Sequence, residues 1–367
     1  MHVLVTGGAG FIGSHIVEYH LKQGDSVLAV DDLSTGSREN IEPFQSNGNF
    51  RFEEADILTW TGIEKAVCWS DRVYHMAAVV GMFKVLKEPI KVLAVNIAGT
   101  ERILRGARAS SWYPDILLAS TSEVYGNRDE PGIDLSEEME PVVSGHMTPR
   151  SNYAVSKMAD ELYGLSYARQ HNLRVRIVRF FNVVGPRQTG KYGMVAPRFV
   201  DQAVKGNPIT VYGDGDQTRC FLDVRDAVVA LDRLIANPAS IGEIVNVGCQ
   251  HEVTINELAQ LAQSKSPVKT AIDHMSYEEA YGKEFDEIFH RRPSVKKLQA
   301  LTGFIPQWTL EKTIEDLVSR KLQEIYEFNE TKGEEHGDNT LFYSEPQYAF
   351  KYDRVISWTG QDIAYAQ

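Results

Sequence analysis

The N-terminal segment restricts the fold most strongly. Residues 2–6 form a short apolar run that ends directly in the glycine-rich sequence TGGAGFIG. Gly7, Gly10 and Gly13 recur every third residue, and a helix-like run leads to a second apolar segment at 26–32. Glycine at these places permits a tight turn, close approach of the backbone to a pyrophosphate and close packing of helix on strand. The segment predicts a β–α–β unit that places dinucleotide phosphates at a helix N-terminus.

Strand-like and helix-like segments continue to alternate through the first half of the chain. The segments RFEEADI, RVYHMAA, DILLASTS and RVRIVRFFN have strand composition, and the runs 94–110 and 153–172 repeat apolar residues at three- and four-residue spacing. This alternation predicts an α/β fold with a mostly parallel sheet and helices on both faces.

The second half is richer in turns. PRQTGKYGM, GNPITVYGDGDQT and NVGCQHEVT carry clusters of turn residues, which indicate a substrate-facing lobe. Two further runs, 254–265 and 309–328, have helical spacing, and the first begins with the capping-box pair Thr254 and Glu257.

These patterns divide the chain into three parts. We expect residues 1–182 to form the dinucleotide-binding domain, with a return to its sheet near 225–250, and 183–328 to form mainly the substrate lobe. Residues 329–367 are expected to be a C-terminal extension of unassigned role, with a polar linker, NETKGEEHGDN, before an aromatic-rich segment.

Charge and composition exclude several classes of function. The net charge of −12 disfavours nonspecific binding of nucleic acid or of a membrane surface. No apolar run reaches the roughly 18 residues of a membrane span, and the first residues lack a signal-peptide pattern, so we expect a cytoplasmic protein. The cysteines Cys68, Cys220 and Cys249 are far apart, and no histidine pair has zinc spacing, so no metal is expected.

The end of the second predicted strand indicates the cofactor. Asp31 and Asp32 follow the glycine-rich turn at the distance where a carboxylate accepts hydrogen bonds from a ribose 2′-OH and repels a 2′-phosphate. Arg38 lies close enough in sequence to hold a phosphate, but two carboxylates outweigh it. We therefore predict NAD rather than NADP.

A tyrosine and a lysine have the spacing of a redox base. Tyr153 and Lys157 are four residues apart, so a helix places them on one face. A lysine ammonium and a positive nicotinamide ring would lower the pKa of the tyrosine, which then removes a proton from a substrate hydroxyl. Thr121, at the end of the preceding strand, is expected to hydrogen-bond the same oxygen.

Taken in order, these motifs resemble one family. TGGAGFIG, VDDLSTG, ADI (55–57), HMAA (75–78), STSEVYG, YAVSK and RFFNVVGPRQ are similar to the motifs of extended short-chain dehydrogenases/reductases, the NAD-dependent nucleotide-sugar epimerases, dehydratases and decarboxylases. The resemblance covers about residues 1–325. It implies a Rossmann-like, doubly wound parallel sheet with a smaller C-terminal substrate lobe, tightly held NAD, a UDP-linked substrate and a homodimer formed through helices 94–110 and 153–172.

The resemblance also implies roles for individual residues. Besides the glycines and the two aspartates, the implied contacts to the dinucleotide are Phe11, Ile12, Asp56, Ile57, Ala77, Ala78 and Asn96. The implied contacts to the nucleotide diphosphate or the sugar are Asn182, Arg187, Tyr212, Arg219, Arg291 and Arg292.

Glu123, in STSEVYG, bears on the reaction. A 4-epimerase oxidises the sugar at C4 and returns hydrogen to the other face, so it needs no second base. A 4,6-dehydratase and a glucuronate decarboxylase both act on the 4-keto sugar further, and a carboxylate serves that step. Glu123 therefore argues against a minimal epimerase and joins Thr121, Tyr153 and Lys157 as a candidate catalytic residue.

Several reactions remain open from the sequence. The triplet Thr-Ser-Glu and the segment HRRPSV resemble UDP-glucuronate decarboxylases, which we favour. NYAVSK looks more like epimerases, so a UDP-hexose or uronate 4-epimerase is the first alternative and a 4,6-dehydratase the second. A non-catalytic NAD-sensing module is a different class, and it is disfavoured because Tyr153 and Lys157 are both present.

Overall fold

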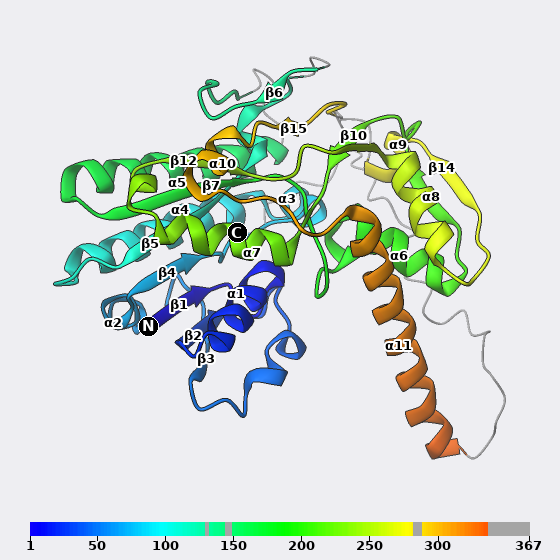
Figure 1. Ribbon diagram of the computed structural model, residues 1–367, viewed down its shortest axis with the longest axis horizontal. Helices are drawn as coiled ribbons and strands as arrows, with labels where there is room; N and C mark the ends of the chain where they lie inside the picture. Colours follow the sequence, from blue (N-terminus) through cyan, green and yellow to red (C-terminus); the bar gives the residue numbers. More distant parts are fainter. Residues whose placement is uncertain (129–131, 144–148, 282–287, 337–367) are drawn as a thin grey trace, which may run out of the picture.

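A seven-stranded sheet forms the centre of the molecule (Figure 1). The computed structural model describes residues 1–128, 132–143, 149–281 and 288–336. All neighbouring strands of the sheet are parallel, in the order β12-β7-β5-β4-β1-β2-β3. The strands are β1 (His2–Thr6), β2 (Ser26–Asp31), β3 (Phe50–Glu54), β4 (Arg72–His75), β5 (Asp115–Thr121), β7 (Arg174–Phe180) and β12 (Ile244–Val247). The predicted α/β class is confirmed, and the order reverses between β1 and β4, where such sheets open a ligand crevice.

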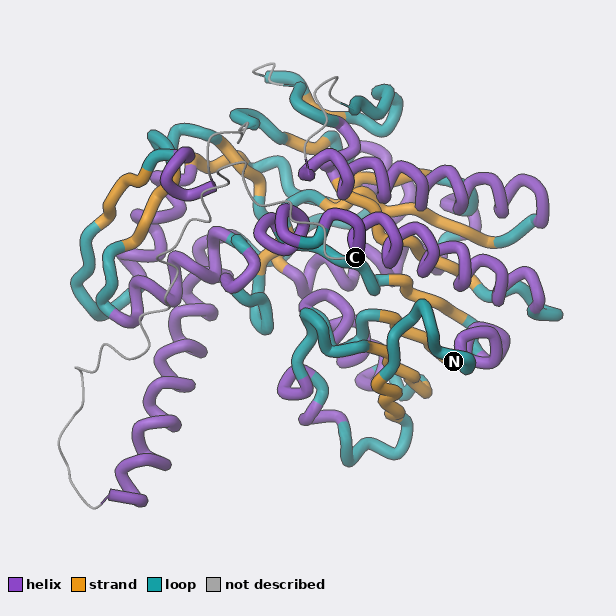
Figure 2. The backbone as a smooth tube through the Cα atoms, turned by 180° about the vertical axis from the view of Figure 1, so that it is seen from behind, coloured by secondary structure: helices purple, strands orange, loops and turns teal. Residues whose placement is uncertain are grey.

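Helices cover both faces of this sheet because the strands are apolar on both sides. In β1, Val3 and Val5 enter the core under helices α1 (Phe11–Lys22) and α7 (Val224–Ala236), whereas Leu4 enters the core on the opposite face. That opposite face carries α2 (Ile63–Trp69), α4 (Pro89–Ala109) and α5 (Pro149–His171), with α3 (Met82–Lys87) beside α5 (Figure 2).

A second layer of elements forms the smaller lobe around its own core. Phe199, Leu258 and Ile314 belong to this core and come from three different helices. The lobe contains α6 (Val195–Lys205), β9 (Ile209–Tyr212), β10 (Thr218–Cys220), β13 (Glu252–Thr254), α8 (Ile255–Lys265), β14 (Ile272–Met275), α9 (Tyr277–Tyr281) and α11 (Leu310–His336). The capping box that begins α8 is confirmed, since Thr254 and Glu257 exchange both hydrogen bonds.

Short elements connect the sheet to the lobe. They are the 3-10 helix η3 (Ser122–Tyr125), the paired strands β6 (Asp134–Leu135) and β15 (Arg292–Pro293), the paired strands β8 (Val183–Val184) and β11 (Leu222–Asp223), and α10 (Lys296–Thr302). None of the helices among the described residues is long and apolar enough to cross a membrane.

The last described helix is longer than the sequence indicated. We expected a polar linker from residue 329, but α11 continues to His336 and projects from the body of the molecule (Figure 1). Polarity alone does not stop a helix, and the segment NETKGEEH contains no proline and several good helix formers. Most of the C-terminal extension, residues 337–367, lies outside the described part of the chain.

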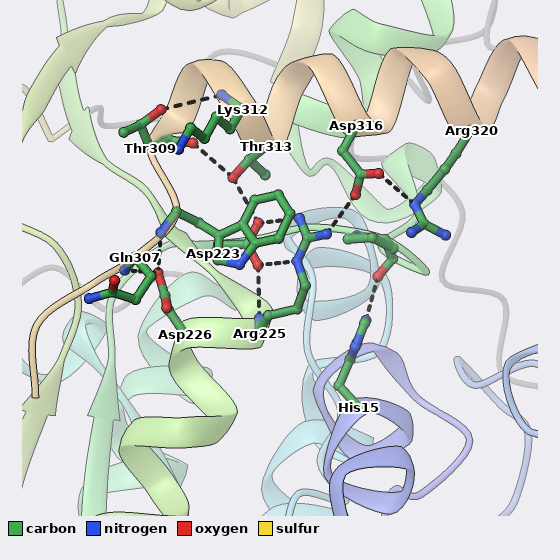
Figure 3. Close-up of polar contacts among 12 residues, drawn as sticks. His15, Asp223, Arg225, Asp226, Gln307, Thr309, Lys312, Thr313, Asp316 and Arg320 are labelled. Carbon is green, nitrogen blue, oxygen red and sulfur yellow. Dashed lines mark hydrogen bonds and ion pairs between the residues drawn. The ribbon is translucent and has the colours of Figure 1, made fainter. Parts of the chain in front are cut away.

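A polar junction fixes α11 to α7 and thus the lobe to the sheet (Figure 3). Asp223 caps α7 and accepts two hydrogen bonds from the Arg225 guanidinium, at 2.8 and 2.6 Å. The same guanidinium reaches Asp316 on α11 at 2.8 Å and lies 3.3 Å from the ring centroid of Trp308. Thr313 of α11 also donates to Asp223, at 2.7 Å. The side chain of Asp223 is fully buried, so its charge depends on these partners.

Replacing the central arginine tests this junction. Arg225→Ala leaves the buried Asp223 without its counter-charge, and we expect a loss of about 3 kcal/mol in the free energy of unfolding, measured by urea denaturation. The control is Arg320→Ala, which removes a half-exposed partner of Asp316 and is expected to cost less than about 1 kcal/mol. Equal losses in the two variants would contradict a special role for the junction.

Candidate active site

One continuous cavity of about 520 Å³ joins the glycine-rich turn to the lobe. It opens at the carboxyl ends of β1, β2, β4 and β5, where the strand order reverses. Most residues that the sequence singled out line it: Gly7, Gly10, Phe11, Ile12, Gly13, Asp31, Asp32, Asp56, Ile57, Ala77, Ala78, Thr121, Glu123, Tyr153, Lys157, Asn182, Tyr212, Arg219 and Arg291.

The glycine-rich turn is shaped by contacts that exclude side chains. Gly7 has a φ of +69°, and a Cβ there would lie 2.8 Å from the backbone nitrogen of Ala77. A Cβ on Gly13 would lie 2.0 Å from the carbonyl oxygen of Gly7. Only glycine lets α1 begin this close to β1, with its N-terminal N–H groups toward the cavity. This cradle fits a dinucleotide pyrophosphate.

The end of β2 presents carboxylates to the same part of the cavity. Asp31 is buried and accepts hydrogen bonds from the backbone N–H groups of Ala9, at 3.0 Å, and Leu33, at 2.8 Å. Burial raises the pKa of Asp31, and these two backbone hydrogen bonds oppose that shift. Arg38, the residue that would attract a 2′-phosphate, is paired with Glu54 instead. The arrangement therefore favours NAD.

Tyr153 and Lys157 both line the cavity. Burial raises the pKa of Tyr153, the Glu123 and Asp160 carboxylates raise it further, and a hydrogen bond with Thr121 opposes the rise. The prediction that Lys157 and the nicotinamide ring together lower this pKa concerns the complex with NAD and stays a prediction. The Lys157 ammonium donates to Asp160 Oδ2 at 3.0 Å. Asp160 was not recognised in the sequence.

Glu123 forms an ion pair with Arg291 in the cavity. Arg291 Nη1 donates to Glu123 Oε1 at 2.5 Å, and the side chain of Arg291 is only 7% exposed. The Nε and Nη2 atoms of Arg291 are buried and have no hydrogen-bond partner among the described residues. Because buried donors are normally satisfied, these two nitrogen atoms indicate a site for an anionic group of a ligand.

A buried asparagine holds the two sides of this ion pair together. The Tyr125 hydroxyl donates to Asn246 Oδ1 at 2.7 Å, and Asn246 Nδ2 donates to the Ser294 carbonyl at 3.3 Å. Tyr125 lies two residues after Glu123, and Ser294 lies three residues after Arg291. Asn246 therefore connects the turn that carries the carboxylate to the segment before β15 that carries the guanidinium.

A buried ion pair supports the same turn from behind. Arg179 Nε and Nη2 donate to the two oxygens of Glu161, at 2.8 and 2.7 Å, and the guanidinium lies 4.7 Å from the ring centroid of Tyr125. Ser120, just before Thr121, donates to Glu161 at 2.6 Å. Sequence reasoning missed this pair and Asn246, although polar residues within otherwise apolar strands were a usable signal.

The lobe adds positive charge and aromatic surface at the other end of the cavity. Arg219 lines this end, and Arg198, which the sequence analysis did not single out, lies 3.9 Å from the ring centroid of Tyr212. Asn182 donates to the Cys220 carbonyl at 3.2 Å and faces the cavity between the two ends. Two guanidinium groups and an aromatic ring suit a diphosphate attached to a base.

Three predicted site residues lie outside the cavity lining: Asn96, Arg187 and Arg292. Asn96 is fully buried, accepts from the backbone N–H of Val79 at 2.8 Å and donates to Ser156 Oγ at 3.0 Å. It connects the loop after β4 to α5 and therefore shapes the cavity wall from behind.

Both outlying arginines are held by carboxylates. Arg187 pairs with Glu18 on α1 at 2.5 Å, and Arg292 pairs with Asp134 at 2.5 Å and with Glu252 at 3.3 Å. Alternate residues of a strand point to opposite sides, so Arg292 faces away from the cavity that its neighbour Arg291 lines. Within the described residues, no group of three or more His, Cys, Asp or Glu side chains is arranged to hold a metal ion.

The carboxylates at the end of β2 predict cofactor preference. We expect NADP to bind at least about tenfold more weakly than NAD, because a 2′-phosphate loses a charge-assisted hydrogen bond and is repelled by Asp31 and Asp32. Calorimetric titration of the full chain with each dinucleotide measures the ratio. Equal affinities would show that the carboxylates do not select the cofactor.

Comparison with known proteins gives the family. The model of the NAD dependent epimerase/dehydratase family matches residues 3–248. A UDP-N-acetyl-alpha-D-glucosaminuronate decarboxylase of Bacillus cytotoxicus is 36% identical over 316 residues, which cover 86% of this chain and 96% of that protein. UDP-glucuronic acid decarboxylase 2 of Arabidopsis thaliana is 34% identical over 329 residues, which cover 89% of this chain and 69% of that protein.

Solved structures show the same fold. A UDP-glucuronic acid 4-epimerase from Bacillus cereus, in complex with UDP-glucuronic acid and NAD, has a TM-score of 0.78 at 27% identity and covers 88% of this chain and 100% of that one. A UDP-glucose 4-epimerase from Thermotoga maritima, with UDP-glucose, has a TM-score of 0.78 at 26% identity and covers 89% and 100%. The chain belongs to the NAD-dependent epimerase/dehydratase family and is an NAD-dependent enzyme with a Rossmann-like fold.

Proposed function

We propose that this enzyme decarboxylates a UDP-linked hexuronic acid through a 4-keto sugar. The observation that carries the proposal is Arg291, a buried guanidinium whose Nε and Nη2 atoms have no partner among the described residues, at the end of the cavity where we place the sugar. A sugar carboxylate satisfies both groups in the bidentate geometry that arginine favours. The names of the two decarboxylases reported above support the same substrate class.

The first step takes place at C4 of the sugar. Tyr153 removes the proton of the C4 hydroxyl, and Thr121 orients the reacting oxygens through its hydrogen bond with the phenol. NAD, when bound in the glycine-rich cradle, supplies reversible oxidation at C4. Arg219 and Arg198 bind the diphosphate and fix the sugar relative to Tyr153.

The second step breaks the bond between C5 and C6. The C4 ketone lies β to the carboxylate, so the electron pair of that bond moves into an enolate between C4 and C5 while carbon dioxide leaves. Glu123, beside Arg291, relays a solvent proton to C5. Tyr153 then returns its proton to the C4 oxygen as the ketone is reduced, which restores the starting state of the enzyme.

A uronate 4-epimerase is the second candidate. It is favoured by the fold similarity to the Bacillus cereus 4-epimerase and by the segment NYAVSK. Such an enzyme must also bind the sugar carboxylate, but it retains C6 and needs no proton at C5. The two reactions therefore share Arg291 and Tyr153 and differ at Glu123.

Product analysis separates these reactions. The full chain is incubated with NAD and UDP-glucuronate or UDP-N-acetylglucosaminuronate, with UDP-glucose in parallel, and the products are identified by proton NMR. The proposal expects a UDP-pentose from a uronate and no turnover of UDP-glucose. Conversion of a uronate to its C4 epimer alone would support the second candidate and end the first.

Neutralising Glu123 gives a mechanistic test. Glu123→Gln is expected to slow formation of the decarboxylated product by about 10²-fold or more, because the proton relay to C5 is lost. Tyr153→Phe is expected to slow product formation by a similar factor, because the oxidation at C4 is impaired. Reduced cofactor, which absorbs at 340 nm, therefore accumulates only in Glu123→Gln. Glu315→Gln, an exposed carboxylate on α11, serves as the control. Wild-type decarboxylation by Glu123→Gln would refute its role.

We further propose that the enzyme is a cytoplasmic homodimer whose interface is the α4–α5 surface. Ile90 on α4 is 83% exposed, and Leu162 and Tyr163 on α5 are 66% and 38% exposed. Large apolar side chains exposed on adjacent long helices suit a second copy of the chain. Leu162→Glu is expected to give a monomer in light scattering where the unchanged chain gives a dimer, and a dimer in both would exclude this face.

A further inference from the structure

The lysine of the catalytic pair has a buried partner that the proposed reaction does not use. Lys157 Nζ lies 3.0 Å from Asp160 Oδ2, and the two side chains are 4% and 3% exposed. They are three residues apart on α5, so the helix itself holds them together. Removing two charges from water is costly, so the burial of the Lys157–Asp160 ion pair indicates that it serves the site.

Among the described residues, Asp160 is the carboxylate that forms an ion pair with Lys157. From β4, His75 faces the lysine, and burial, followed by the Lys157 charge, lowers the pKa of His75 to about 3, so it is neutral. Glu161 on α5 is neutralised by Arg179. Thr100 on α4 hydrogen-bonds Asp160. Glu123 on η3 pairs with Arg291.

We propose that Asp160 is the counter-charge of the catalytic lysine and that it keeps Tyr153 protonated until a positively charged nicotinamide ring lies beside the phenol. Asp160 is thus a positioning residue that acts through Lys157. The proposal rests on the proposed role of Tyr153 as the base.

The net charge beside Tyr153 decides how strongly the phenolate is stabilised. A lone ammonium one helical turn from Tyr153 would stabilise the phenolate, but an ammonium in contact with a carboxylate is a dipole whose effect falls off faster with distance. Burial raises the pKa of Tyr153, the hydrogen bond with Thr121 lowers it, and the charges of Glu123 and Asp160 raise it further. The missing positive charge must come from the oxidised cofactor, so the base is formed only in the complex that is ready to oxidise the sugar.

The test measures the protonation of Tyr153 directly. The full chain is labelled with ¹³Cζ-tyrosine, and the Tyr153 signal is identified by its loss in Tyr153→Phe. Its pH titration is recorded after bound dinucleotide has been removed and again with NAD. In Asp160→Asn the midpoint is expected at least about one pH unit lower than in the unchanged chain, because the lysine charge is no longer balanced.

A double-mutant cycle separates charge from structural damage. In Lys157→Met/Asp160→Asn both charges are gone, and the Tyr153 midpoint is expected to return close to that of the unchanged chain. Asp160→Glu, which keeps the charge, is expected to do the same, and Glu64→Gln, an exposed carboxylate on α2, should leave the midpoint unaltered.

Each outcome bears on the proposal. An unchanged midpoint in Asp160→Asn, with the other tyrosine signals in place, would overturn it, and so would a lowered midpoint in the double variant. If Asp160→Asn does not fold, the comparison of the double variant with Lys157→Met decides, since the proposal requires a higher midpoint in Lys157→Met. No sugar substrate is present, so failure here is distinct from failure of the proposed decarboxylation.

Discussion

The burial of Arg291 is the constraint on which the substrate end of the cavity depends. A guanidinium that is 7% exposed requires counter-charge and hydrogen-bond acceptors, and Glu123 supplies only part of both. Several buried polar contacts hold Glu123 and Arg291 close to each other. Asn246 joins their two segments, and the Arg179–Glu161 pair supports the turn from behind. Such support is expected where a site must be ready for an anion before the anion arrives.

The cavity lies between the central sheet and the smaller lobe, and each of them lines one end of it. The reversal of strand order between β1 and β4 opens the crevice for the dinucleotide, and the lobe closes over its sugar end. The junction of Asp223, Arg225 and Asp316 fixes α11 to α7, so the lobe keeps a defined position over the crevice. Arg198 and Arg219, which come from the lobe, therefore line the same cavity as Tyr153.

The sequence predicted the cofactor end of the site better than the substrate end, for a physical reason. The glycine-rich turn and Asp31 belong to one local β–α–β unit, so spacing along the chain reflects their arrangement in space. Glu123 and Arg291 are 168 residues apart, and only the fold brings them together. The sheet could be predicted from strand alternation, whereas the extra turns of α11 could not, because a polar segment is compatible with both helix and linker. Asp160 was missed because a carboxylate on a helix is usually exposed.

In the proposed reaction, the carboxylate of the substrate leaves as carbon dioxide and C5 receives a proton from water. The most direct measurement is proton and deuterium NMR of the reaction with UDP-glucuronate in deuterium oxide. The account predicts a UDP-pentose that carries one deuterium at C5, placed on a single face, together with released carbon dioxide. A product that retains C6 and carries no deuterium at C5 would contradict it, and would leave Glu123 as a residue that only orders the active-site turn.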